Sequence, residues 1–106
     1  MIIDDLFDIE YGQGEYNNKS ILLEKTNGIP VISSKGDNNG IYGFYDVDPF
    51  YNNVISVARV GTICSAFYHD YDCCIDDNCL VLKPKKDFTK QEMLYFTLLR
   101  THLRSF

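Results

Sequence analysis

The chain has 106 residues, 45% of them hydrophobic, and its formal net charge at pH 7 is -5. This length favours a single domain, and the hydrophobic content excludes a disordered tail. The acidic balance argues against a general nucleic-acid binder, because contacts with phosphates require lysine and arginine side chains.

The first third of the chain predicts a short helix and then one strand. Residues 3–10 are expected to form a short amphipathic helix or turn, and residues 15–28 a loop or a weak helix. The stretch Ile29–Ser33 is typical of a strand. Because Pro30 cannot donate a hydrogen bond to a ladder, we expect this strand to lie at a sheet edge or to begin there.

A dense group of turn-forming residues follows at 35–40, and the dipeptide Asn39-Gly40 is a strong signal for a tight turn. Residues 41–45 predict a second strand, and residues 46–53 predict a loop. The glycines and asparagines therefore place a turn between two strands.

The second half of the chain contains the clearest strand, Val54–Val60, whose apolar side chains alternate between two faces. A short strand is expected at Cys64–Tyr68 and another at Cys79–Leu82. The acidic segment between these two is expected to be a polar loop.

The last element is the best-defined helix. Thr89 and Glu92 have the spacing of a capping box, and Phe88 precedes the cap, where it can pack against Met93. One apolar stripe then follows at helical spacing: Met93, Phe96, Leu99 and Leu103. The predicted class is α+β, with a small twisted mixed or antiparallel sheet, Gly/Asn-rich turns, a short N-terminal helix and a C-terminal helix.

Four sequence blocks resemble one family in their order and spacing. They are Gly28–Ser34, similar to a G-x-I-P block followed by apolar residues and serine; Asn39–Gly43; Ile55–Gly61, similar to a strand that ends in R-x-G; and Asp77–Lys85, similar to a closing strand before a helix. Each block alone is weakly specific. Together they resemble the target-recognition domains of type I restriction–modification specificity subunits, over residues 6–103.

The resemblance implies a mixed α/β domain that recognises part of a double-stranded DNA target. In the intact subunit, two such domains alternate with long helices, which space the half-sites and dock the methyltransferase subunits. Methylation and cleavage belong to the methyltransferase and restriction subunits, so the resemblance implies no catalysis and no cofactor in this chain.

The chain departs from the family pattern in two respects. Residues 1–106 hold a single target-recognition-like domain without the long spacer helix, and the domain is short, which suggests a trimmed recognition loop. Three explanations stay open: a half-subunit that forms a homodimer, a fragment of a larger protein, and a remnant.

Base recognition requires hydrogen-bonding groups on rigid loops, and Ser34, Lys35, Asn38 and Asn39 meet this description. Asparagine can pair with adenine through two hydrogen bonds, and nearby glycines allow the backbone to approach closely. The alternative is a plain hairpin turn without a binding role.

Further candidate DNA contacts are Arg59, Tyr68, Lys83 and Lys85. The lysines form a short basic run that suits phosphate contacts, or alternatively a solvated loop. Arg59 interrupts an apolar strand, so it either contacts a phosphate or, slightly favoured, forms an ion pair with an acid such as Asp46 or Asp77. Tyr68 either contacts DNA or packs at a strand end.

Other chemistry is not expected from this sequence. The cysteines at 64, 73, 74 and 79 form no C-x-x-C pair, so zinc binding is disfavoured, and Cys64 and Cys79 are expected to fill the core. His69 beside Asp70 is expected to be solvated, and no nucleophile motif accompanies it. We therefore predict a protein without metal or intrinsic catalysis.

The chain is expected to be cytoplasmic. Acids follow the first residues where a secretory signal would carry bases, and no apolar run is long enough to span a bilayer. The net charge leaves one competing function open: a protein-interaction module that binds restriction–modification subunits, as an inhibitor or truncated competitor, without binding DNA.

Overall fold

Two β-sheets form the body of the protein, as seen in the computed structural model, which describes residues 3–16, 22–35, 38–59 and 65–98. The larger sheet has the strand order β1-β7-β4-β5, and all neighbouring strands are antiparallel. Its strands are β1 (Phe7–Tyr11), β4 (Val54–Ala58), β5 (Ala66–His69) and β7 (Cys79–Pro84).

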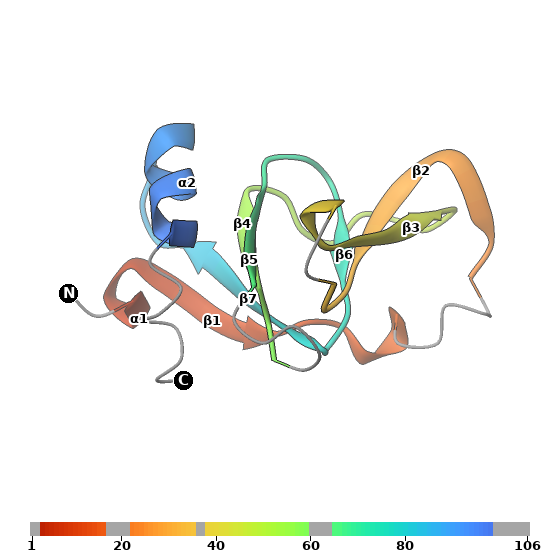
Figure 1. The fold of residues 1–106 in the computed structure, drawn as a ribbon, viewed down its shortest axis with the longest axis horizontal. Helices are drawn as coiled ribbons and strands as arrows, with labels where there is room; N and C mark the ends of the chain where they lie inside the picture. The colour runs from red at the N-terminus through yellow and green to blue at the C-terminus, as the bar shows by residue number, and fades with distance from the viewer. Residues whose placement is uncertain (1–2, 17–21, 36–37, 60–64, 99–106) are drawn as a thin grey trace.

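The smaller sheet has the order β3-β2-β6. Strand β2 (Glu24–Ile32) forms an antiparallel hairpin with β3 (Ile41–Tyr45) and pairs in parallel with the two-residue strand β6 (Cys74–Ile75). The hairpin extends away from the end of the molecule that carries the C-terminal helix (Figure 1).

The helices α1 (Ile3–Leu6) and α2 (Lys90–Leu98), the 3-10 turn η1 (Gly14–Tyr16), and η3 (Asn38–Gly40), a turn whose residues have positive φ, complete the described chain. The capping box at the start of α2 is confirmed. The Thr89 amide donates to Glu92 Oε1 at 2.9 Å, and the Glu92 amide donates to Thr89 Oγ1 at 3.1 Å. No helix in these ranges is long and apolar enough to cross a membrane.

Among the described residues, two core clusters lie on the two sides of the larger sheet, and a third, formed by Tyr16, Val31, Tyr45 and Cys74, lies on the smaller sheet. One cluster joins this sheet to α2 and consists of Phe7, Ile55, Val57, Ala66, Leu82, Met93 and Phe96. A second cluster joins the opposite face to β2 and β6 and consists of Ile32, Tyr51, Val54, Cys73, Ile75, Cys79 and Val81. Strand β4 is therefore buried on both faces, with Ile55 and Val54 in different clusters.

The α+β class is confirmed, but three local expectations are wrong. Of the short helix or turn expected over residues 3–10, only Ile3–Leu6 is helical, because Phe7–Tyr11 pairs with β7 as a strand. The loop or weak helix expected over 15–28 contains the first half of β2. The polar loop expected after β5 contains β6, and its residues Cys73–Asp76 are buried.

Pro30 lies inside β2 and not at its start, and β2 is the central strand of its sheet. The proline is tolerated because β6 pairs only with Val31 and Ile32, so at Pro30 the strand has the single partner Phe44 on β3. The expectation of an edge strand is thus wrong for β2 as a whole, but at Pro30 itself the strand is paired on one side only, as an edge strand is.

Gly28 lies where β2 passes close to the backbone of β3. A Cβ at this position would lie 2.4 Å from the carbonyl oxygen of Tyr45. We expect Gly28→Ala to lower the free energy of unfolding by about 1–3 kcal/mol, because backbone must shift to make room. Urea denaturation measures this, and equal losses in Gly28→Ala and the exposed control Gly14→Ala would contradict the explanation.

Candidate nucleic-acid interface

The turn between β2 and β3 holds an unusual backbone. Asn38, Asn39 and Gly40 have φ values of 50°, 56° and 76°, so three consecutive residues lie in the left-handed region. Glycine and asparagine adopt this region at lower cost than other residues, which explains why this turn requires them. The turn signal seen in the sequence is confirmed.

The two asparagines of this turn face different surroundings. The Asn39 amide nitrogen donates to the Tyr71 hydroxyl at 2.6 Å and to the Tyr68 carbonyl oxygen at 3.3 Å, so its side chain joins the turn to β5. Asn38 is exposed, and no hydrogen bond ties its side chain to the described part of the chain. The turn therefore presents Asn38 outward while Asn39 holds it in place.

The neighbours of Asn38 in the predicted site also lie near the surface. Ser34 is half-buried, and Lys35 is exposed. Of Tyr68, β5 brings only the carbonyl oxygen to the turn; the ring packs against the cluster that joins the larger sheet to α2, and the hydroxyl donates to Asn53 Oδ1 at 2.5 Å. Burial, reinforced by the charge of Asp70, raises the pKa of Tyr68, so the phenol stays protonated at neutral pH.

Arg59 lies at the other end of the larger sheet. Its backbone amide bonds to Asn78, beyond the end of β4, whereas Tyr68 pairs with Ile55 near the start of that strand. The guanidinium donates to the Asp77 carbonyl oxygen at 2.6 Å and lies 4.4 Å above the ring of Tyr11. The structure thus places Arg59 on the protein surface away from the turn.

The lysines of β7 and the segment after it are paired with carboxylates. Lys83 Nζ lies 3.2 Å from Glu10 Oε1, and Lys85 Nζ lies 3.9 Å from Asp8 Oδ1. These contacts arise because β7 pairs with β1, which carries the acids. Lys83 and Lys85 therefore do not form a strong positive patch around the turn.

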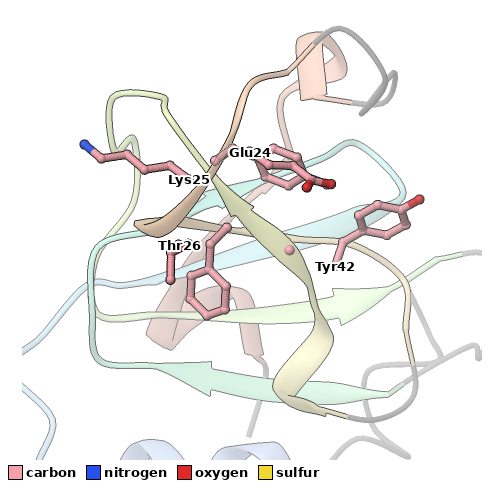
Figure 2. A pocket seen from close by; sticks show the side chains of 7 residues that line it. Glu24, Lys25, Thr26 and Tyr42 are labelled. Carbon is pink, nitrogen blue, oxygen red and sulfur yellow. The ribbon is translucent and has the colours of Figure 1, made fainter.

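A hollow of about 640 Å³, which was not predicted from the sequence, opens between the start of β2 and β3. Lys25 and Thr26 line it from β2, and Tyr42 and Phe44 from β3. Tyr42 and Phe44 are 54% and 44% exposed, and Lys25 and Tyr42 lie at opposite ends of the hollow (Figure 2). The signal that was overlooked is the i, i+2 spacing of two aromatic residues on one strand.

His69 differs most from its sequence-based expectation. It is fully buried, with Nε2 2.7 Å from Ser56 Oγ and Nδ1 2.7 Å from the Tyr71 hydroxyl. Burial lowers the pKa of His69 to about 4, and the charge of Asp70 opposes this shift. The expectation that His69 is a solvated loop residue is wrong, because β5 extends to His69 and pairs it with Val54.

The cysteines lie mostly in the core. Cys79 is buried in β7, as expected, and Cys64 lies outside the described residues. Cys73 and Cys74 are also buried, and burial raises the pKa of the Cys73 thiol to about 12. Within residues 3–16, 22–35, 38–59 and 65–98, no three His, Cys, Asp or Glu side chains converge as metal ligands.

Comparison with known proteins shows the family to which this two-sheet α+β domain belongs. The sequence profile of the type I restriction modification DNA specificity domain matches residues 1–106. This chain belongs to that family. A search of curated proteins gives no significant match.

Solved structures of type I systems share the fold of this specificity domain. The S subunit from M. genitalium aligns with a TM-score of 0.72 at 16% identity, over 99% of this chain and 26% of its own. The HsdS subunit from Thermoanaerobacter tengcongensis gives 0.66 at 17% identity, over 97% and 28%. A structure of type I R-M complex assembly gives 0.68 at 18% identity, over 97% and 28%. The specificity domain thus spans about a quarter of each subunit.

The sequence blocks of the specificity domain occupy defined places in its fold. Gly28–Ser34 forms the end of β2 and enters the turn, and Asn39–Gly43 leaves the turn into β3. Ile55–Gly61 contains most of β4, and Asp77–Lys85 contains β7. Two of the four blocks therefore flank the turn that presents Asn38.

Proposed function

We propose that this specificity domain binds double-stranded DNA and recognises part of a target sequence without catalysing a reaction. It would direct the methyltransferase and restriction subunits of the same system to that target in the cytoplasm. Family membership supports this proposal, as does the fold shared with type I specificity subunits. A second copy, in a homodimer, would supply recognition of the other half of a split target.

One observation carries the assignment of the recognition surface. The turn is held by Asn39, and the side chain of Asn38 projects from it without a bond to the described chain. A carboxamide presented rigidly can form two hydrogen bonds with adenine in the major groove. We therefore assign base contacts to Asn38 and Ser34, and the positioning of the turn to Asn39.

We assign the phosphate contact nearest this turn to Lys35, and a contact farther along the duplex to Lys25, which lies beside Tyr45 at the other end of the β2–β3 hairpin. Both are exposed, and Lys25 forms no ion pair with a described residue. Tyr68 supports the turn through its carbonyl oxygen, which accepts from the Asn39 amide nitrogen. A smaller contribution to binding is expected from Lys83, Lys85 and Arg59. Each already has a partner within the protein and would contact a phosphate only where DNA replaces that partner.

The side chain of Asn38 is expected to determine sequence preference. Asn38→Ala should lower the preference for the selected target over a scrambled duplex by about tenfold, because a lost bidentate contact with a base costs about 1–3 kcal/mol. Competition binding with the two duplexes measures this. The control is Gln91→Ala, which removes an exposed carboxamide from α2. A preference unchanged in Asn38→Ala would overturn the assignment.

The phosphate contacts are tested by the salt dependence of binding. Each phosphate contact adds about 0.9 to the slope of log affinity against log salt, so Lys25→Ala should reduce that slope by about 1 for every duplex sequence. Fluorescence anisotropy of labelled duplex across a salt series provides the slope. Failure of the unmodified chain to bind any duplex, combined with binding to the methyltransferase subunit, would support an interaction module instead.

A further inference from the structure

A continuous line of hydrogen bonds runs from the centre of the larger sheet to the turn. Ser56 Oγ lies 2.7 Å from His69 Nε2, His69 Nδ1 lies 2.7 Å from the Tyr71 hydroxyl, and that hydroxyl accepts from Asn39 Nδ2 at 2.6 Å. Ser56 is 2% exposed and His69 is 0% exposed. The line therefore joins two strands of the buried sheet to the backbone that presents Asn38.

The chemistry of the partners indicates a direction for each bond. An amide nitrogen only donates, so the Tyr71 oxygen accepts from Asn39 and its own proton is available for His69 Nδ1. His69 Nδ1 is then an acceptor, which places the imidazole proton on Nε2, where it is donated to Ser56. In this arrangement the Ser56 oxygen and His69 Nδ1 accept, and the Asn39 amide, which also lies 3.4 Å from His69 Nδ1, approaches that nitrogen as a donor.

This arrangement requires a neutral imidazole. A proton on Nδ1 would make this nitrogen a donor beside the Asn39 amide, which is also a donor and lies 3.4 Å away, and Tyr71 could no longer donate to the ring. Burial disfavours such protonation more strongly than the charge of Asp70 favours it, so the pKa of His69 is lowered. At neutral pH the line therefore stays in the form that holds Asn39.

The turn needs such support because its backbone is costly. Asn38 and Asn39 both adopt the left-handed region, which disfavours residues with a side chain. The bonds from Asn39 to Tyr71 and to the Tyr68 carbonyl oxygen tie this backbone to β5 and the segment after it. Without them, the direction in which Asn38 projects would no longer be fixed.

We propose that Ser56, His69 and Tyr71 are positioning residues for DNA recognition, which set the orientation of Asn38 by holding Asn39. This inference rests on the proposed function. A hydrolytic role for the Ser56–His69 pair does not fit, because both side chains are buried and a substrate cannot reach the serine oxygen.

Tyr71→Phe in the full chain tests the inference, since it removes the hydroxyl and keeps the ring, which packs edge-on against His69 at 5.4 Å. The matched control is Tyr95→Phe, at an exposed tyrosine of α2. Two quantities are measured at a temperature where each variant is fully folded. They are the ¹⁵N shifts of the His69 ring with the amide shifts of Asn39 and Gly40, and the ratio of affinities for a selected and a scrambled duplex.

We expect the unmodified chain to carry the His69 proton on Nε2. We expect Tyr71→Phe to shift the turn amides and to lower the affinity ratio at least tenfold, with affinity for the scrambled duplex unchanged. Tyr95→Phe should alter neither quantity. A merely structural role would weaken binding to both duplexes alike and leave their ratio unchanged.

Two results would overturn the inference in distinguishable ways. If the unmodified chain discriminates between duplexes and Tyr71→Phe does so equally well, or if the His69 proton lies on Nδ1, the positioning role is wrong and the proposed function survives. If the unmodified chain shows no discrimination between duplexes, the proposed function itself fails and the positioning role falls with it.

Discussion

Phe7→Ala is expected to lower the free energy of unfolding by about 3–5 kcal/mol, which is the usual cost of deleting a buried phenylalanine ring. Phe7 is completely buried on β1. Its ring centroid lies 5.2 Å from that of Phe96 and 5.7 Å from that of Phe88, so it joins α2 to the larger sheet. Since the total free energy of unfolding of a native protein is about 5–15 kcal/mol, this variant would be only marginally folded.

Urea denaturation followed by circular dichroism measures this loss. Phe50→Ala is the matched control, because Phe50 is 55% exposed in the loop before β4 and lies outside the core clusters. We expect the control to lose about 1 kcal/mol or less. Similar losses in both variants would show that α2 is not held by the cluster around Phe7.

Acid is expected to destabilise the fold through His69. Its pKa is about 4 in the folded protein, against 6.5 for an unperturbed histidine. Above pH 6.5 the imidazole is neutral in both the folded and the unfolded chain, so this group does not change the free energy of unfolding with pH. Between pH 6.5 and 4 only the unfolded chain binds the proton, so the free energy of unfolding falls by about 1.4 kcal/mol per pH unit, or about 3 kcal/mol in total.

Denaturation midpoints measured across this pH range test the expectation, and a ¹⁵N titration of the ring gives the folded pKa directly. In His69→Gln the contribution of the histidine to the slope of the free energy of unfolding against pH should disappear, whatever the absolute stability of the variant. A His69 ring that titrates near 6.5 in the folded protein would contradict the buried, neutral imidazole.

The elements predicted well from sequence are those with strong local signals. Strand β4 shows alternating apolar residues, the turn at Asn39-Gly40 has the residues its backbone demands, and α2 begins with a capping box that the structure reproduces. The turn and the cap depend on contacts within a few residues along the chain, and the continuous apolar run of β4 marks a strand buried on both faces, so the sequence alone indicates all three.

The elements predicted poorly depend on distant pairing. Strand β6 has two residues in an acidic segment, and it forms because β2, more than forty positions earlier, pairs with it in parallel. The first half of β2 is polar and exposed, so no alternation of apolar residues marks it. Phe7–Tyr11 likewise becomes a strand through pairing with β7.

In the candidate site, too, local features were predicted from the sequence and features that depend on distant contacts were not. Its turn was visible in the sequence, but the different surroundings of Asn38 and Asn39 depend on Tyr68 and Tyr71, about thirty positions away. The pairing of Lys83 with Glu10 joins residues 73 positions apart and could not be seen either. Charge runs in a sequence do not show which carboxylates will lie beside them.

Selection from a pool of randomised double-stranded DNA tests the central claim most directly. The purified chain is expected to enrich one short sequence pattern, and Asn38→Ala is expected to enrich a relaxed or different pattern from the same pool. Recovery of DNA without any enriched pattern, or of no DNA at all at low salt, would contradict recognition by the turn between β2 and β3.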